Sequence, residues 1–189
     1  MTGRSERIAR QFDISIRWTA FPLHPETPPD GRTLEELFRG RDFDIDAMLD
    51  RLRQAARDLG LPFGDRQMTF NSRRAQELGK WAETQGQGDA FHLAAFKAYF
   101  ADGLNIYRTD VLENIAASVG LDPKAAAAVV NDGLFREAVD NDWARSRAMG
   151  ITVVPTFAMA GAFIEGAQPY EAIEAMLTRL GVAKRETLP

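Results

Sequence analysis

The residues best placed to do chemistry surround one proline, in the stretch "GITVVPTFAM" at 150–159. Proline has no N–H to give to a β-ladder, so Pro155 belongs at the first residue of the apolar strand that follows it. A cis bond before it would cost only about 0.5–1 kcal/mol and would turn the main-chain groups of Val154 outward. With Thr156, these groups could pair with an extended substrate. The alternative is a trans proline that merely begins a strand.

Other residue types that support catalysis or metal binding are scarce. The chain has no cysteine, which removes disulfides, thiolate metal ligands and cysteine nucleophiles together. His24 and His92 lie too far apart in the sequence to give a metal-ligand spacing, and each is interpreted as structural or surface-exposed. The acidic cluster Asp42, Asp44 and Asp46 lacks the glycine and the final glutamate of a calcium loop, so it predicts a solvated helix start.

Composition bounds the class of protein. The chain has 189 residues, of which 45% are hydrophobic and 26% charged, and its net charge is −4. These values are typical of a globular domain and do not favour binding to nucleic acid or to an anionic membrane. No apolar run reaches the roughly 20 residues that span a bilayer, and no signal peptide is visible at the start. Together with the lack of cysteine, this predicts a cytoplasmic protein.

Strands are predicted only near the two ends of the chain. The segment "DISIRWTAF" at 13–21 alternates apolar and polar residues and is interpreted as a strand, preceded by a short helix over 4–12. The proline-rich stretch "PLHPETPPDG" ends it. Near the other end, "PTFAM" and "AFI" predict a hairpin joined by Ala160 and Gly161, followed by an amphipathic helix that Gly181 caps.

The region between Leu34 and Met149 contains no convincing strand and is interpreted as helical throughout. Its first long helix, "IDAMLDRLRQAARDLGLP", has one apolar face and ends at Gly60 and Pro62. A second is expected to begin at Asn71 or Ser72 and to carry Ala75, Leu78 and Ala82 inward. Two later helices carry start signals: Asp110 with Glu113 has a capping-box spacing, and Asp122 precedes a proline. The residues that the helical period places on one face of the first long helix are Ile45, Met48, Leu49, Leu52, Ala56 and Leu59.

Taken together, "GITVVPTF", "GAQP" at hairpin distance, "ISIRWTAF" before "PLHPETPPDG", and "FNSRRAQELGKWAETQG" with "AFKAYFADGLNI" resemble the DsbA family, and within it the FrnE-like subgroup. The resemblance implies an α/β fold, namely a thioredoxin-like sheet formed by 1–33 and 150–189 with an all-helical insertion at 34–149. It also implies a cis Val154–Pro155 bond, with Val154, Pro155 and Thr156 binding the substrate, a thiol-containing peptide or small molecule.

The chain departs from the family at the catalytic position. FrnE-like proteins carry Cys-x-x-Cys after a first strand, and this sequence has neither that strand nor any cysteine. A thiolate at a helix N-terminus is what such enzymes need. Related kappa-class glutathione transferases and hydroxychromene carboxylate isomerases use a serine instead, for which Ser5 is the one candidate; its alternative is a solvated serine at a helix start. Glutathione is therefore the only cofactor that the resemblance implies.

The missing first strand would be an interior strand of the sheet. Its loss leaves two edges, near Ile14–Trp18 and Thr156–Met159, with unpaired main-chain groups. Three elements could close the gap: direct pairing of these segments, the C-terminal tail "VAKRETLP", or a second chain. The tail is polar and ends in proline, so a homodimer with both edges at or beside the contact is the expectation.

Three functions follow from these observations. The first is a DsbA-family thiol–disulfide oxidoreductase homologue that is redox-inactive as given; a strand followed by Cys-x-x-Cys, in frame in the DNA upstream of Met1, would decide for it. The second is a non-enzymatic module that binds peptides at the proline edge. The third is a glutathione-dependent isomerase or transferase of kappa type. No catalytic residue is assigned in this chain, because a fold carries no function without a site.

Overall fold

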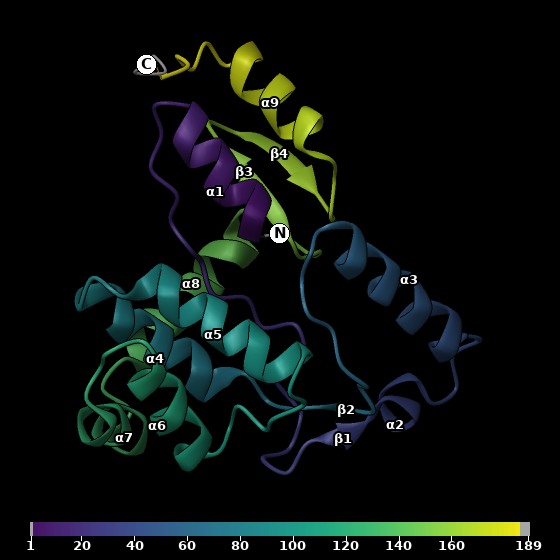
Figure 1. Cartoon of the computed structure of the whole chain (residues 1–189), viewed down its shortest axis with the longest axis vertical. Coiled ribbons are helices and arrows are strands. Elements are labelled where there is room, and N and C mark those ends of the chain that lie inside the picture. Colours follow the sequence, from purple (N-terminus) through teal and green to yellow (C-terminus); the bar gives the residue numbers. More distant parts are fainter. Residues whose placement is uncertain (1, 186–189) are drawn as a thin grey trace. The chain divides into compact units, whose positions relative to one another are not determined.

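The computed structural model of the chain describes residues 2–185, with side chains from residue 4 onward (Figure 1). It divides the chain into two compact units. We call Met1–Phe21 with Asp142–Pro189 the terminal unit, and Pro22–Asn141 the helical unit. The sequence predicts the corresponding boundaries at 33/34 and 149/150. No helix among the described residues is long and apolar enough to cross a bilayer.

The helical unit consists of helices and one very short pair of strands. Strands β1 (Arg32–Thr33) and β2 (Met68–Thr69) pair antiparallel, with Arg32 opposite Thr69. The prediction of no strand between Leu34 and Met149 is therefore wrong at β2, whose two residues are too few to show a period. The helices are α2 (Leu34–Phe38), α3 (Ile45–Asp58), α4 (Arg73–Thr84), α5 (Gly88–Phe100), α6 (Thr109–Ser118), α7 (Pro123–Asp132) and α8 (Arg136–Ala148), which continues into the terminal unit.

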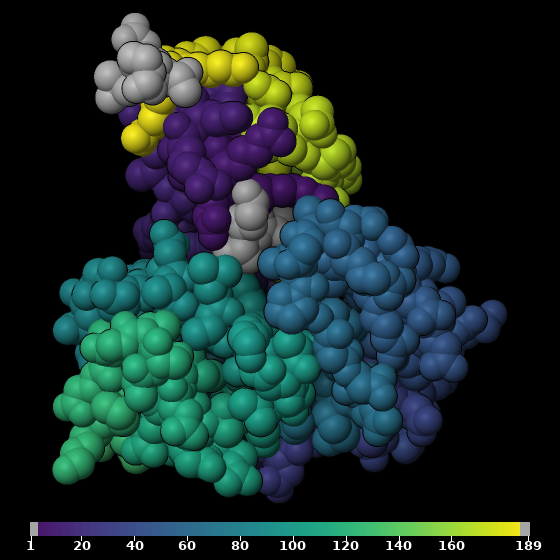
Figure 2. Space-filling view, in the orientation of Figure 1, coloured from purple at the N-terminus to yellow at the C-terminus, as the bar shows by residue number. Residues whose placement is uncertain are grey.

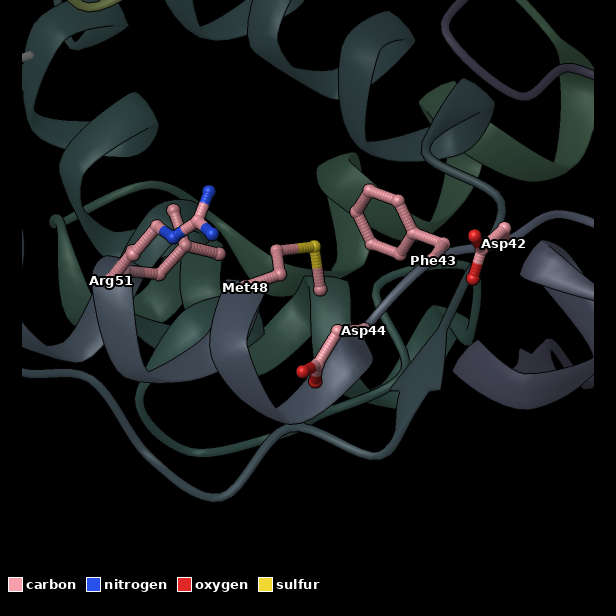
Figure 3. Close-up of a pocket in the computed structure, with 6 residues that line it drawn as sticks. Asp42, Phe43, Asp44, Met48 and Arg51 are labelled. Carbon is pink, nitrogen blue, oxygen red and sulfur yellow. The ribbon is translucent and has the colours of Figure 1, made fainter.

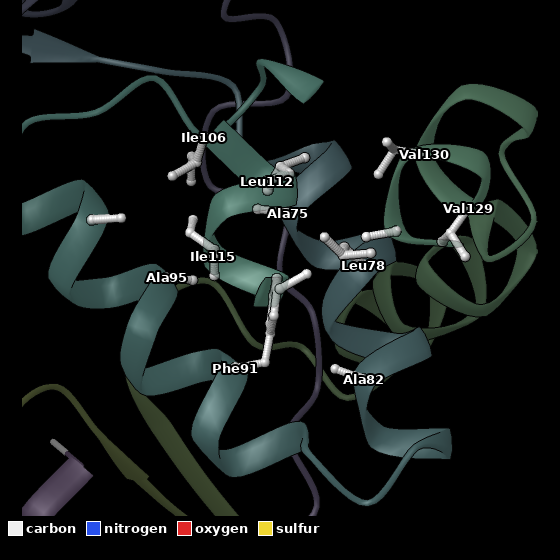
Figure 4. Packing of buried hydrophobic residues seen from close by; sticks show 13 residues of the cluster. Ala75, Leu78, Ala82, Phe91, Ala95, Ile106, Leu112, Ile115, Val129 and Val130 are labelled. Carbon is white, nitrogen blue, oxygen red and sulfur yellow. The ribbon is translucent and has the colours of Figure 1, made fainter. Parts of the chain in front are cut away.

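The core of the helical unit lies between α4, α5, α6 and α7 (Figure 4). Small residues such as Ala75 and Ala82 on α4 let the neighbouring helices approach, and Phe91 on α5 and Leu112 on α6 fill the space between them. Leu78 is fully buried at the centre of the α4 face. The predicted inward positions of α4 are thus confirmed, because a 3.6-residue period places them on one side.

Helix starts follow the predicted signals at α7 but not at α6. The Asp122 carboxylate accepts from the Lys124 N–H at 3.0 Å, and Pro123 occupies the first helical position. At α6 the predicted capping box of Asp110 and Glu113 is wrong, because the helix already begins at Thr109 and Asp110 instead receives two hydrogen bonds from Arg108. The local sequence does not show whether the Asp110 carboxylate caps the helix or pairs with the neighbouring Arg108 guanidinium.

Helix α3 leaves much of its predicted apolar face accessible. Of the six residues on this face, Leu49 alone is buried, and Leu52 and Leu59 are exposed. The side chain of Asp44 caps the helix by accepting from the Ala47 N–H at 2.9 Å. Periodicity correctly indicates that the apolar residues share a face, but it does not say whether another element covers that face.

The terminal unit packs two helices from opposite ends of the sequence onto a hairpin. Its elements are α1 (Thr2–Gln11), β3 (Thr156–Met159), β4 (Ala162–Glu165) and α9 (Tyr170–Arg179). Its core combines Ile8 and Phe12 with the α9 residues Ile173 and Leu177. The hairpin is confirmed: Met159 lies opposite Ala162, and the two turn residues between them both have positive φ, as a tight two-residue turn requires. The side chains of the hairpin that pack against this core are Phe157, Met159 and Ile164.

The segment 13–21 forms no strand, so that prediction is wrong. Its residues alternate as predicted, with Ile14, Ile16 and Trp18 half-buried, but no strand pairs with it among the described residues. In the part of the tail that the structure describes, up to Arg185, an antiparallel bridge joins Phe12 to Lys184, and Arg185 donates to the Phe12 and Ile14 carbonyls at the beginning of the segment. Strand formation needs a hydrogen-bonding partner, which an alternating pattern alone cannot supply.

A buried carboxylate holds the far end of this extended segment. Asp142, which is almost inaccessible to solvent, accepts from the Ala20 N–H and from the Arg17 guanidinium, both at 2.9 Å. A charged acceptor makes stronger hydrogen bonds than a neutral one, particularly in a buried position. The Asp142 side chain thus fixes residues 17–20 without any β-ladder.

Candidate functional site: a main-chain edge beside Pro155

The loop that leads into β3 exposes two apolar residues next to a fixed turn. The Val154–Pro155 peptide bond is cis. Val153 and Val154, which precede it, are 42% and 38% exposed. The Thr156 hydroxyl donates to the Val153 carbonyl at 2.6 Å, and the Gly166 N–H donates to the Pro155 carbonyl at 2.8 Å. These two bonds tie the loop to itself and to the end of β4.

The register of the hairpin fixes which main-chain groups of β3 face outward. In a two-residue hairpin the residues beside the turn exchange hydrogen bonds, and bonded and non-bonded pairs then alternate. Met159 and Phe157 are therefore bonded to β4, whereas the N–H and C=O groups of Thr156 and Ala158 point away from it. Within the described residues, β4 is the only strand that pairs with β3. This free edge is able to accept an extended peptide.

The outer face of the hairpin, which the free edge borders, carries both apolar and polar side chains. Ala158 lies opposite Phe163 on the hairpin, on the face turned away from the core, and Phe163 is 44% exposed. Thr156 lies opposite Glu165 on the same face. A peptide on the edge would thus find an aromatic ring and a carboxylate beside it, together with the exposed loop residue Val154.

The outer edge of β4 differs from that of β3. Gln168 donates from its amide to the Glu165 carbonyl at 3.1 Å, so one outward acceptor of β4 is already engaged. The shallow hollow beside this edge is lined by β4 and α9 residues that include Phe163, Met176 and Arg179. The β3 edge is therefore the more available of the two for a main-chain partner.

Sequence reasoning identified Val154, Pro155 and Thr156 but missed Ala158 and Phe163. The signal for both was present, because the turn at Ala160 and Gly161 sets the register and the period of two then gives the faces. The structure brings all five residues onto one loop and one hairpin.

The other candidate residues lie elsewhere. Ser5 is 4% exposed on α1, so its interpretation as a solvated serine is wrong. His24 lies 3.8 Å from Glu26; burial lowers the pKa of its imidazole, outweighing the carboxylate, which raises it. His92 lies 3.6 Å from Glu83. Among the described residues no three acidic, histidine or cysteine side chains come together as a metal site.

Comparisons with solved structures place the fold. A probable DsbA oxidoreductase from Streptomyces coelicolor is 23% identical, with a TM-score of 0.86 over 100% of this chain and 86% of that one. A 2-hydroxychromene-2-carboxylate isomerase is 17% identical, with a TM-score of 0.69 over 95% and 86% of the two chains. The cytosolic disulfide reductase DsbM from Pseudomonas aeruginosa is 21% identical, with a TM-score of 0.51 over 69% and 75%.

At these identities the likeness concerns the fold, a thioredoxin-like α/β arrangement that is mostly helical with small sheets. A search of curated proteins finds no matching relative. The model of one protein family, the DSBA-like thioredoxin domain, matches residues 1–178. With nearly the whole length matched, the chain belongs to the family of DSBA-like thioredoxin domains.

Proposed function

We propose that this chain binds an extended peptide at the edge formed by Val154, Pro155, Thr156 and Ala158, and that it does so without thiol–disulfide exchange. The observation that carries the proposal is the outward direction of the Thr156 and Ala158 main-chain groups beside an exposed apolar loop. Such an edge binds peptide main chain, and neighbouring side chains select among sequences. Thiol-containing peptides are natural candidates, since the family is named after an oxidoreductase.

Thiol–disulfide exchange requires an attacking thiolate, and the 189 residues contain no cysteine. The chain should neither reduce insulin nor oxidise a dithiol peptide above background. Turnover in a metal-free and tag-free preparation of this polypeptide would contradict the redox-inactive part of the proposal. It would leave the peptide-binding part standing, because docking at the edge needs no thiol.

Glutathione-dependent isomerisation or transfer is the alternative. The likeness to the isomerase favours it at the level of fold. Burial of Ser5 in α1 does not favour it, because a ligand could reach that hydroxyl only if the helix moved. A cytoplasmic location is part of the same proposal, in keeping with a cysteine-free chain.

Binding at the edge can be tested by removing one outward N–H. Ala158→Pro deletes a donor that β4 does not use, so the hairpin should persist. In Ala158→Val, the matched control, the N–H is kept. Peptides selected from a library of extended decamers should shift the Thr156 and Ala158 amide resonances and bind the valine variant normally. We expect the proline variant to bind these peptides at least about tenfold more weakly, because it loses one main-chain hydrogen bond to the peptide. Equal binding by both variants would rule out this edge.

A further inference from the structure

Residues of α3 and of the segment just before it line a hollow on the helical unit (close-up in Figure 3; this part of the chain is blue in Figure 2). Phe43 and Leu52 are 43% and 38% exposed there, and Met48 lies between Phe43 and Arg51. The hollow has a volume of about 350 Å³. A largely apolar floor with charges at its ends is typical of a surface that another protein covers. Its lining comprises Asp42, Phe43, Asp44, Met48, Arg51 and Leu52.

This face is built on fixed geometry. The Phe43 ring stacks on Phe38 with 4.3 Å between the ring centroids. Arg53, from the next turn of α3, bonds both Asp50 and Asp65 at 2.9 Å, which ties the helix to the loop that follows it. An apolar face held in place before binding costs less conformational entropy to cover than a mobile one.

The charged residues that line the hollow are separated by sign. Asp42 and Asp44 lie at one end and Arg51 at the other, although Arg41 and Asp50, their neighbours in the sequence outside the lining, carry the opposite charges. Within the described residues, neither Asp42 nor Arg51 takes part in an ion pair or a side-chain hydrogen bond. Asp44 and Arg51 are seven residues apart, about 10 Å along a helix axis. The hollow therefore carries two unpaired charges of opposite sign at its two ends.

A surface with this arrangement complements itself. When two such helices pack antiparallel about a two-fold axis, each positive end meets the negative end of the other copy. If the axis passes between Ala47 and Met48, the two methionines lie at the centre. Leu52 then faces Phe43, and Arg51 faces the end that carries Asp42 and Asp44. The same register thus pairs the apolar residues and the charges.

We propose that two copies of this chain associate through antiparallel α3 helices in this register. A membrane is a poor alternative, because the acidic end of the hollow would be repelled by anionic lipid. An unrelated peptide would have to present both charges at the matching spacing, which a second copy does by symmetry. The sequence predicts a homodimer contact at the sheet edges. Only a missing partner strand supports that contact, whereas on α3 the arrangement of charges also indicates which partner fits.

Charge reversal gives a test that distinguishes recognition from damage to the fold. Arg51→Asp places a new carboxylate against the end that carries Asp42 and Asp44, twice in a homodimer. Asp42→Arg places a new guanidinium beside Arg51 and Arg53 of the other copy, again twice. In a mixed pair of the two variants both contacts become attractive. Arg145→Asp, which changes an exposed charge in the terminal unit, is the matched control.

Sedimentation velocity at 10, 50 and 200 µM is the measurement. Wild type and the Arg145→Asp control should show the same concentration-dependent rise in mass, and high salt should reduce it. Each single α3 variant should weaken association at least about tenfold, and their equimolar mixture should recover it. A wild-type monomer of 21.0 kDa at every concentration would overturn the proposal, as would a mixture that stays monomeric or a dimer that neither variant weakens.

Discussion

The two units of the chain bury their apolar side chains in different ways. In the helical unit, the core joins helices that follow one another in the sequence, from Ala75 on α4 to Val130 on α7. In the terminal unit, a smaller core joins Ile8 and Phe12 to residues of α9, near the other end of the chain. Local packing depends mainly on helix periodicity, whereas packing between distant segments also needs main-chain contacts that bring them together. We therefore expect the terminal unit to be easier to unfold than the helical unit.

The largest test of this difference removes one fully buried ring from the smaller core. Phe12→Ala should lower the free energy of unfolding by about 3–5 kcal/mol, and Leu78→Ala in the helical unit by about 2–5 kcal/mol. Both wild-type residues are 0% exposed. Amide hydrogen exchange followed by mass spectrometry should show protection lost in β3, β4 and α9 of the first variant only, and in α4–α7 of the second. Loss throughout the chain in either variant would mean that the units do not unfold separately.

A second test compares two aspartates on α8, one on each side of the boundary between the units. Asp142→Ala removes a carboxylate that is 1% exposed and accepts two hydrogen bonds, so it should cost about 2–3 kcal/mol. Asp140→Ala removes a carboxylate that is 57% exposed and lies 2.6 Å from Arg73, so it should cost about 0.2–1 kcal/mol. Urea unfolding of both variants measures the difference. Equal losses would show that Asp142 is not what holds the extended segment.

The smallest expected effect is a pH dependence in the helical unit. Burial would raise the pKa of the Glu83 carboxyl, but the His92 imidazole 3.6 Å away and the ammonium group of Lys80, which donates hydrogen bonds to Glu83, outweigh it, so the pKa lies below its usual value. A depressed carboxyl pKa stabilises the fold above the unfolded-state pKa, and this contribution disappears as the pH falls through the folded-state value.

The test of this effect is Glu83→Gln, which should flatten the fall in stability between pH 7 and pH 3 by about 0.2–1 kcal/mol, the usual worth of a partly exposed ion pair. The exposed Glu137→Gln serves as control. Unfolding by urea at a series of pH values gives the two profiles. A Glu83→Gln profile as steep as that of the wild type would mean that His92 and Lys80 do not favour the ionised carboxyl.

Sequence patterns predicted the elements whose stabilising contacts are local. The helices of the insertion, the Asp122 cap and the hairpin at Ala160 and Gly161 were all visible, because each rests on residues a few positions apart. Two features could not be predicted in this way: that residues 13–21 form no strand, and that the apolar face of α3 stays exposed. Each depends on whether a distant segment lies beside the element, which neither alternation nor amphipathicity reveals.

The same distinction between local and long-range contacts applies to the candidate site. Val154, Pro155 and Thr156 were identified from one short motif, because the groups that make the edge belong to the main chain of consecutive residues. The hydrogen bonds that Asp142 accepts from Arg17 and Ala20 join residues more than a hundred positions apart, and no sequence pattern predicted them. The charges used in the proposed α3 contact are visible in the sequence, but the contact also needs an exposed apolar face, and the helical period does not say whether that face is exposed.

The division of the terminal unit between the two ends of the chain has a consequence for synthesis on the ribosome. Helix α1 emerges early, but Ile173 and Leu177, which cover Ile8 and Phe12, emerge only after the entire helical unit has been made. The helical unit can meanwhile fold as its segments appear, since its partners are neighbours in the chain. Helix α1 must wait throughout with its apolar side uncovered. Until α9 leaves the exit tunnel, the apolar side of α1 is therefore a surface that chaperones can bind.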